Sequence, residues 1–197
     1  MTTRRGVTGQ LEIACNVTRQ VPLIADLVNM ATSQRRGGVP TPCPRDADLV
    51  AAFAAAAGDR AGTDLRDDPA AGAQLAELAG ELRAALLAEH AADQAARINA
   101  MIRRYRAQPY LVEDVGQPFH LHFHGQGGTR VQAMGGEFAT ALALIVDGYG
   151  TGRFGQCAAD RCDAIYIDLT RNGSRRYCGA ACTARAKTAA YRGRRRG

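Results

Sequence analysis

Apolar residues recur at helical spacing through most of the first 150 residues, which predicts a mainly helical body. The clearest pattern runs from about Ala71 to Arg106, where leucine, isoleucine and methionine repeat at helical intervals until Pro109 ends it. Residues 9–17 are interpreted instead as a short strand. Shorter helices are predicted over residues 22–33, 46–57 and 137–150.

Residues 119–124 alternate strictly between aromatic or aliphatic residues and histidine, which predicts a strand paired in a hairpin with residues 110–115. One face of this strand would carry the imidazoles of His120, His122 and His124. They could line a ligand pocket or hold a transition metal, but neighbours on one face lie about 6.5–7 Å apart, so a second metal or cofactor is not favoured. The alternative is an amphipathic strand with a polar, partly exposed face. Asp26 and Asn29 are further pocket candidates, or they cap and turn the first helix.

Four cysteines in the last 41 residues form two close pairs, C-x4-C and C-x3-C, separated by fifteen residues. Close thiol pairs at this separation are typical of a single tetrahedral Zn²⁺ site. The expected ligands of this one structural zinc are Cys157, Cys162, Cys178 and Cys182. The alternative is four ordinary free thiols. Because the surrounding segment has almost no apolar core, we expect the metal to supply much of its folding energy.

The residues between and after the cysteine pairs predict a hairpin and a helix. Residues 165–169 alternate as a half-buried strand does, and Asn172-Gly173 is typical of a type I′ turn that leads into a second strand. The segment after Cys182 is predicted to be helical, with Cys178 and Cys182 on its stripe of small residues. A knuckle, a hairpin and a helix that carries the last two ligands make a treble-clef-like zinc finger. The predicted fold class is therefore mainly α with small β hairpins (α+β).

Positive charge is concentrated at the C-terminal end. The chain carries a net charge of +6, but residues 169–197 contain nine basic residues and no acidic one, so residues 1–168 have a net charge of −3. Such a cluster favours contact with nucleic-acid phosphates, and the alternative is a solvated tail that offsets the charge of a zinc tetrathiolate. The candidate nucleic-acid-binding residues are Arg171, Arg175, Arg176, Arg185, Lys187, Arg192, Arg194, Arg195 and Arg196.

The stretch 157–196 resembles the CGNR zinc-finger family. It has the first cysteine pair, a strand that ends near D-x-[ST]-R-N, an aromatic residue before the third cysteine and a final R-A-K-x-A-A-Y-R-like helix. The matching positions are Asp168, Arg171, Asn172, Arg176, Tyr177, Arg185, Ala186 and Tyr191. The signature tetrapeptide departs from the family, because Cys182-Thr183-Ala184-Arg185 stands where Cys-Gly-Asn-Arg is expected. The cysteine and arginine are kept, so the zinc site is expected to be intact.

The resemblance extends to the N-terminal ABATE domain that accompanies this finger in the family. Its motifs are similar, in order, to Ala25-Asp26-Leu27-Val28-Asn29, to the leucine-spaced helix LAELAGELRAALLA, to the segment R-I-N-A and to the strand H-L-H-F. The resemblance implies two units, an ABATE-like ligand-binding or association domain over 1–150 and a CGNR-like finger with a basic helix over 151–197. It also implies a transcription regulator.

These observations predict a cytoplasmic DNA-binding regulator that responds to a small molecule bound by the body, with the signal passing through residues 138–154. A homodimer is expected, since one small finger buries too little surface for strong specific binding. The apolar segments are too short to cross a bilayer, so no membrane contact is expected. The alternative is a metal- or cofactor-dependent enzyme built on the histidine strand, with a structural or protein-binding finger, but we expect no enzymatic activity.

Overall fold

The protein, as a computed structural model, is described over residues 9–58, 64–113 and 119–195. It is mostly helical with small antiparallel strand pairs, as the sequence predicted. The α-helices are α1 (Gly9–Thr32), α2 (Asp46–Ala57), α3 (Ala71–Leu86), α4 (Ala91–Arg104), α5 (Arg130–Tyr149) and α6 (Ala180–Arg194). The strand pairs are β1 (Arg35–Arg36) with β2 (Val39–Pro40), β3 (Ala107–Val112) with β4 (His120–Gly125), and β5 (Phe154–Gln156) with β6 (Ile165–Ile167).

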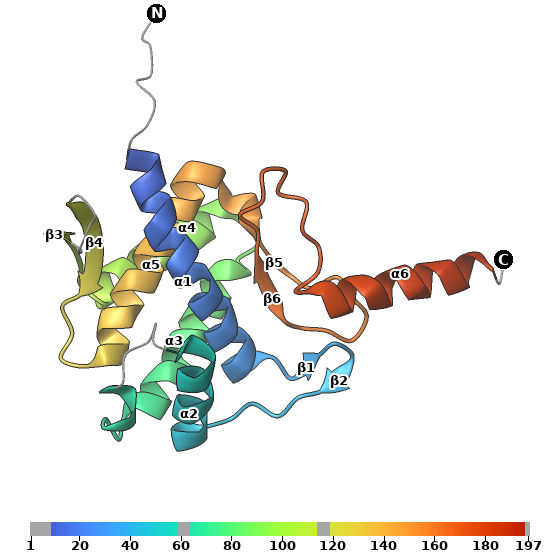
Figure 1. Cartoon of the computed structure of the whole chain (residues 1–197), viewed down its shortest axis with the longest axis horizontal. Helices are drawn as coiled ribbons and strands as arrows, with labels where there is room; N and C mark the ends of the chain where they lie inside the picture. Colours follow the sequence, from blue (N-terminus) through green and yellow to red (C-terminus); the bar gives the residue numbers. More distant parts are fainter. Residues whose placement is uncertain (1–8, 59–63, 114–118, 196–197) are drawn as a thin grey trace, which may run out of the picture.

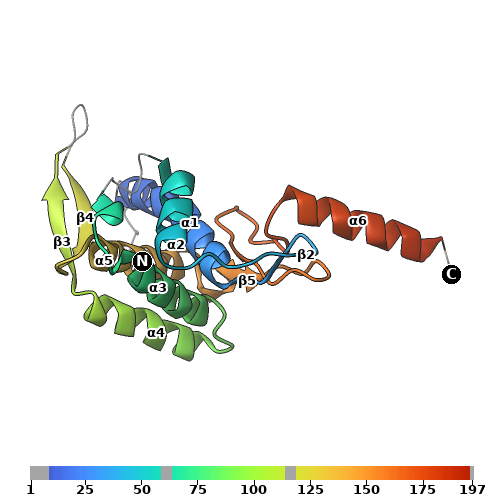
Figure 2. The ribbon, with the colours of Figure 1, turned by 90° about the horizontal axis from the view of Figure 1, so that it is seen from below.

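Helices α1, α3 and α5 pack against one another at the centre of the body, with α2 and α4 on the outside (Figure 1). Their facing side chains form one apolar core in which Ile24, Leu75, Leu78 and Phe138 are fully buried. Helix α6 lies outside this bundle and projects away from it, and a view turned by 90° shows the same projection (Figure 2). No helix in the described ranges is both long and apolar enough to span a membrane.

The prediction of a strand at residues 9–17 is wrong, because α1 begins at Gly9 and continues through Pro22 to Thr32. Its buried or partly buried Val17, Val21 and Ile24 follow helical spacing and pack into the core. The apolar stripe thus crosses the proline, and tertiary packing outweighs the backbone hydrogen bond that a proline removes from a helix.

The long helical region predicted over 71–106 is two helices, α3 and α4, separated by residues 87–90. A single helix of that length would be about 54 Å long and would carry Ile98 and Met101 away from the bundle. The break lets α4 turn back beside α3 and α5, so both side chains are buried in the core. The helix predicted over 46–57 is confirmed as α2.

Helix α5 begins at Arg130, not after Gly135-Gly136, and Thr129 caps it by accepting the Gln132 N–H at 3.2 Å. The two glycines lie inside the helix where other elements come very close. A Cβ at Gly135 would lie 2.5 Å from a ring carbon of Tyr105, and one at Gly136 would lie 2.5 Å from the backbone nitrogen of Gly125. These glycines therefore let α4 and β4 pack against α5.

The predicted hairpin of β3 and β4 is confirmed, with Tyr110 opposite His122. Strand β3 begins three residues earlier than predicted, at Ala107, and residues 114 and 115 of the predicted strand lie outside the described residues. Its histidine face turns toward α5, since the Nδ1 atom of His124 pairs with the Glu137 carboxylate. The apolar face turns outward, where Phe119 is 61% exposed and Leu111 is 66% exposed. The pair between His124 and Glu137 thus accounts for which face of β4 packs against α5.

The hairpin expected around Asn172-Gly173 is wrong. Strand β6 pairs with the preceding β5, with Gly155 opposite Tyr166, and has no partner strand after it in the described chain. Gly173 has a φ of +57°, but Asn172 has no positive φ, so the type I′ turn does not form. Ile165 and Ile167 explain the change of partner, because both are buried in the core of the body.

Candidate metal centre and basic helix

The four cysteines at the C-terminal end gather into one cluster. The sulfur of Cys162 lies 3.8 Å from those of Cys178 and Cys182, and the latter two are 3.6 Å apart. All four sulfurs, including that of Cys157, lie within 4.8 Å of one another. Four sulfurs about 2.3 Å from a tetrahedral Zn²⁺ would be separated by about 3.8 Å. These distances exclude disulfides, whose sulfurs lie about 2.05 Å apart, and support one structural Zn²⁺.

Two short segments position the ligands. Cys157 directly follows β5, and its N–H donates to the Ala164 carbonyl at 2.8 Å, which closes the turn that contains Cys162. Cys182 lies in the first turn of α6, whereas Cys178 lies two residues before the helix begins. The expectation that the helix carries both of the last ligands is therefore wrong for Cys178.

Backbone N–H groups point at the sulfurs. The Cys178 N–H donates to the Cys157 sulfur at 3.3 Å. Burial disfavours the thiolate of Cys162, but hydrogen bonds from the Gly37 and Ala164 backbones leave the pKa of this thiol lowered. Burial raises the pKa of the Cys178 and Cys182 thiols. A bound zinc ion reverses that preference, since a coordinating thiol is deprotonated outright.

Asp168 organises the loop that leads to the second cysteine pair. This buried carboxylate accepts from the Thr170 N–H at 2.8 Å, from the Thr170 hydroxyl at 2.6 Å and from the Arg175 N–H at 2.8 Å. Burial acts to raise the pKa of Asp168, but these hydrogen bonds outweigh it and hold that pKa below its ordinary value. The D-x-T-R-N motif thus begins with a residue that replaces the missing strand ladder with side-chain hydrogen bonds.

Two of the candidate nucleic-acid-binding arginines are engaged within the finger. The Arg175 guanidinium donates to three carbonyls, those of Ile167 at 3.2 Å, Tyr177 at 3.0 Å and Cys178 at 2.6 Å. The Arg185 guanidinium donates to the Asp160 carbonyl at 3.1 Å and lies against Gly38. Both arginines therefore support the fold around the metal.

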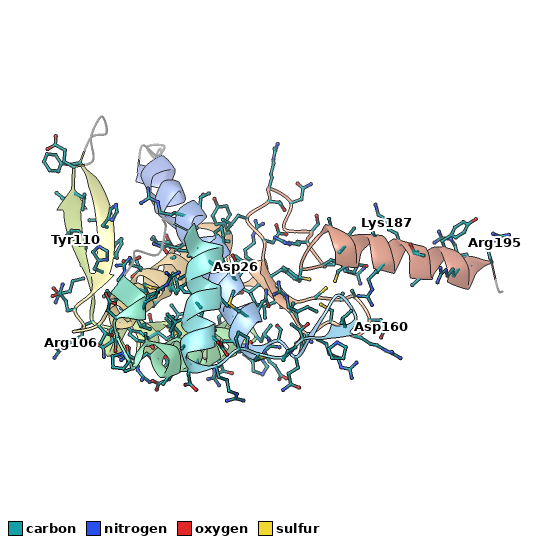
Figure 3. All side chains as sticks on the ribbon, turned by 60° about the horizontal axis from the view of Figure 1, so that its bottom comes forward. Asp26, Arg106, Tyr110, Asp160, Lys187 and Arg195 are labelled. Carbon is teal, nitrogen blue, oxygen red and sulfur yellow. The ribbon has the colours of Figure 1, made fainter. Side chains whose placement is uncertain are left out.

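The other described candidates have exposed side chains, and they are Arg171, Arg176, Lys187, Arg192, Arg194 and Arg195. Beyond Ala186, every α6 side chain that the structure describes is exposed, and the helix contains no acidic residue. Lys187, on this projecting helix, and Arg195, directly after its last residue, lie well away from the body (Figure 3). Arg196 lies outside the described residues.

The histidine hairpin borders a cavity of about 180 Å³ between α1, β4 and α5. His124 pairs with Glu137, and Tyr110 stacks on its ring at 4.8 Å. Gln20 donates to the other oxygen of Glu137 at 2.9 Å, while its own Oε1 is buried without a donor among the described residues. The cavity therefore has a polar wall with one unused acceptor.

The structure brings only part of the predicted pocket set to this cavity. His122 and His124 line it, and His120 begins β4 but its side chain lies outside the described part of the chain. Asn29 is buried elsewhere, against β6, and Asp26 is half-buried in α1. Among the described residues, the four cysteines are the only group of three or more His, Cys, Asp or Glu side chains close enough to share an ion.

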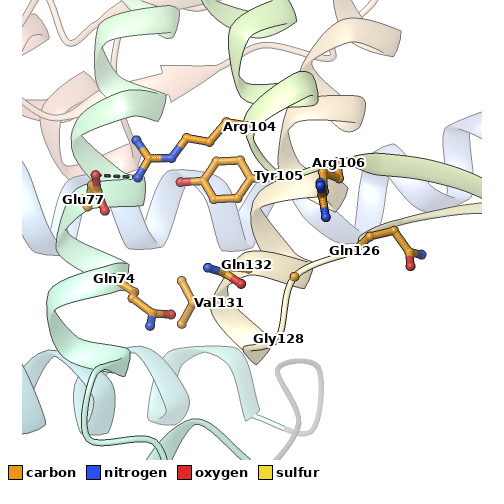
Figure 4. A pocket seen from close by; sticks show the side chains of 10 residues that line it. Gln74, Glu77, Arg104, Tyr105, Arg106, Gln126, Gly128, Val131 and Gln132 are labelled. Atoms are coloured by element: carbon orange, nitrogen blue, oxygen red, sulfur yellow. Dashed lines mark hydrogen bonds and ion pairs between the residues drawn. The ribbon is translucent and has the colours of Figure 1, made fainter.

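A second cavity, of about 340 Å³, was not predicted from the sequence. It lies where β4 passes through Gly127-Gly128 into α5, across from Gln74 of α3, and Arg106 also lines it (Figure 4). The neighbouring Arg104 is held by Glu77 and Glu81, at 2.6 Å and 2.5 Å. The glycine pair directly before a helix start is the signal that could have located this cavity.

Comparison with known proteins identifies one part of the chain. Residues 153–195 match the family model of the CGNR zinc finger, and this range contains all four cysteines together with β5, β6 and α6. No curated protein matches the chain. The ABATE-like nature of the body stays a prediction, as does the division of the chain at residue 150.

Proposed function

We propose that the protein is a transcription regulator that binds DNA through α6 and the loops around its zinc site. One observation carries this proposal: α6 leaves the metal centre with only positive charges and, beyond Ala186, with exposed side chains all round. A helix with no apolar face gains no stability by packing against the rest of the protein. Its side chains are therefore available to contact a partner molecule. A phosphate backbone is the partner that this charge fits.

The dimensions of α6 suit a DNA groove. Its 15 residues span about 22 Å, and the major groove, about 12 Å wide, admits one α-helix. The exposed small residues Ala189 and Ala190 leave room for the helix backbone to approach base edges. Arg192, Arg194 and Lys187 are then available for phosphates on either side of the groove.

The zinc ion would give this helix its direction. Cys182, in the first turn of α6, is tied through the metal to the β5–β6 hairpin, whose Ile165 and Ile167 belong to the core of the body. The base of the helix is thus fixed while the rest is exposed. Loss of the metal would release α6, so DNA binding should require zinc.

We infer further that the body binds a small polar molecule in the cavity beside His124. Support comes from its size and from the buried Gln20 Oε1, which calls for a hydrogen-bond donor. Glu137 lies on α5, which runs to Tyr149, and the Tyr149 carbonyl accepts from Arg153 at 3.2 Å. Occupancy of the cavity could therefore shift the finger by a change in α5. Homodimerisation and a cytoplasmic location stay predictions.

The test is binding of the zinc-loaded protein to a mixed-sequence DNA duplex. The affinity is measured by fluorescence anisotropy at a series of salt concentrations. We expect the logarithm of affinity to fall linearly with that of salt, by about 0.9 per phosphate contacted. Replacement of Arg192 and Arg194 by glutamine should weaken binding about tenfold and flatten the slope by up to about 2.

The matched control replaces Arg97 and Arg103, two exposed arginines of α4, by glutamine. It changes the net charge by the same amount at a distance from α6, so affinity should stay close to that of the native protein. Absence of binding at low salt would refute the proposed function. An equal loss in both variants would show a response to net charge alone, and would refute the role of α6.

A further inference from the structure

We propose that the β1–β2 hairpin of the body is a second phosphate-binding element, which contacts the same DNA duplex as α6 through Arg35 and Arg36. This inference rests on the function proposed above. The hairpin has a two-residue turn, Gly37-Gly38, between Arg36 and Val39. In both ribbon views it lies beside the base of α6 (Figures 1 and 2).

The stem of the hairpin is attached to the finger by backbone groups. The Asp163 carboxylate, between the first cysteine pair and β6, accepts from the Gln34 N–H at 2.9 Å and from the Arg35 N–H at 3.1 Å. In return, the Asp163 N–H donates to the Arg35 carbonyl at 3.1 Å. Arg83, from α3, donates to the Asp163 carbonyl at 2.9 Å and fixes the same point to the body.

The tip of the hairpin reaches the metal centre and α6. Gly37 directs its N–H at the Cys162 sulfur, and a Cβ on Gly38 would lie only 2.3 Å from the Arg185 guanidinium. Both glycines have positive φ, +61° and +87°, which a two-residue hairpin turn of this type requires. Since Arg185 is a residue of α6, the hairpin and the helix form one continuous structure around the zinc site.

No contact within the described part of the fold accounts for the two arginine side chains of this hairpin. Arg35 and Arg36 are exposed, and within the described residues neither guanidinium forms a hydrogen bond or an ion pair. Adjacent residues of a strand point to opposite faces, so the two positive charges lie on opposite faces of the hairpin. Val39 is 63% exposed, and the hairpin contains no acidic residue.

Charge nearby favours an anionic partner. Among the described residues, the carboxylate that is hydrogen-bonded to the hairpin is that of Asp163, and it is already used by two backbone N–H groups. Asp160 is 87% exposed in its side chain and lies near Arg161, at 3.7 Å. Two free guanidinium groups held beside a basic helix by rigid backbone contacts are suited to a second stretch of the phosphate backbone.

The anchoring contacts suggest a clean experiment, because they use backbone atoms that side-chain replacement leaves in place. The full chain with one equivalent of Zn²⁺ is compared with Arg35→Gln/Arg36→Gln in the same salt series on the mixed-sequence duplex. We expect about tenfold weaker binding and a slope reduced by up to about 2, with unchanged zinc content and circular dichroism. Arg35→Lys/Arg36→Lys keeps the charges and should keep most of the slope.

Three results would overturn the proposal, and they are distinguishable. If the hairpin variant binds like the native protein while Arg192→Gln/Arg194→Gln loses affinity, α6 binds DNA and the hairpin does not. If Arg97→Gln/Arg103→Gln loses as much as the hairpin variant, only net charge matters. If the native protein does not bind the duplex at low salt, the proposed function and this extension both fail.

Discussion

The side-chain amide of Asn29 pairs with both backbone groups of Ile165, as a neighbouring strand would. It donates from Nδ2 to the Ile165 carbonyl at 3.0 Å and accepts the Ile165 N–H on Oδ1 at 2.7 Å. Both residues are buried, and 136 positions separate them in the chain. This pair fixes the edge of β6 to the C-terminal end of α1, so the strand next to the zinc site is held by a core helix of the body.

Replacement of Asn29 by alanine should therefore destabilise the protein strongly. It leaves the buried N–H and carbonyl of Ile165 without partners, and each such group costs about 1–3 kcal/mol. We expect the free energy of unfolding in urea to fall by about 2–4 kcal/mol. Asn99→Ala, on the exposed face of α4, is the control and should change it by less than about 0.5 kcal/mol. Equal effects of the two substitutions would contradict the role given to Asn29.

Replacement of Cys178 by serine should remove the zinc ion and unfold α6. Elemental analysis is expected to fall from one zinc per chain to well below half, and the helical signal in circular dichroism should fall with it. Cys43→Ser is the matched control, because Cys43 is a half-buried thiol outside the cluster. Retention of a full equivalent of zinc by Cys178→Ser would show that three sulfurs suffice and that α6 does not depend on this ligand.

Replacement of Asp168 by asparagine should destabilise the finger in a pH-dependent way. The pKa of this carboxyl is below its ordinary value of about 3.9, so its charged form stabilises the fold above that pH and the contribution is lost as pH falls through the folded-state pKa. At pH 7 we expect a loss of about 1–3 kcal/mol in urea unfolding. The gap between native and variant protein should narrow below about pH 4.

Protonation of the zinc thiolates at low pH affects the native protein and Asp168→Asn alike, so the difference between their unfolding free energies isolates the carboxylate. Asp160→Asn serves as the control, since its side chain is 87% exposed. A difference that stays constant from pH 7 to pH 4 and below would mean that charge on Asp168 is not what stabilises the loop.

A pair of glycine substitutions in α5 tests the packing of the histidine hairpin. A Cβ at Gly136 would lie 2.5 Å from the Gly125 backbone nitrogen, which cannot move without displacing β4. Gly136→Ala should therefore destabilise the protein by about 2–4 kcal/mol. Gly148→Ala, in the same helix with no neighbour within 4 Å, should stabilise it by up to about 1 kcal/mol. Thermal unfolding of both variants measures the contrast, and the same sign for both would contradict the close contact.

Hydrogen exchange offers an independent view of α6. Its backbone amides beyond Ala186 lie in a helix without tertiary cover, so they should exchange much faster than those of the buried α5. Addition of a DNA duplex in excess should slow them, while the amides of α4 stay unchanged. If α6 is protected as strongly as α5 without DNA, the helix already has a cover, and the reason for assigning it a DNA partner disappears.

Local patterns were sufficient for much of this protein. The spacing of the four cysteines predicted the metal ligands, because a tetrahedral ion accepts close pairs of thiols almost regardless of the chain between them. The helical periods over 46–57 and 71–106 predicted helices, since burial of one side of a helix leaves a repeat in the sequence. The segregation of charge also placed the basic helix at the correct end of the chain.

Other features depended on contacts between distant residues. Asn29 has a polar side chain of the kind that lines pockets. Only its position opposite Ile165 makes it a link between α1 and β6. Asn172-Gly173 permits a hairpin turn, but the burial of Ile165 in the core gives β6 a different partner. The same is true of Gly37, whose N–H reaches Cys162 from far along the chain. A sequence pattern shows which side of a helix or strand is apolar. Which other element packs against that side depends on tertiary contacts between distant residues, and these leave no local signal in the sequence.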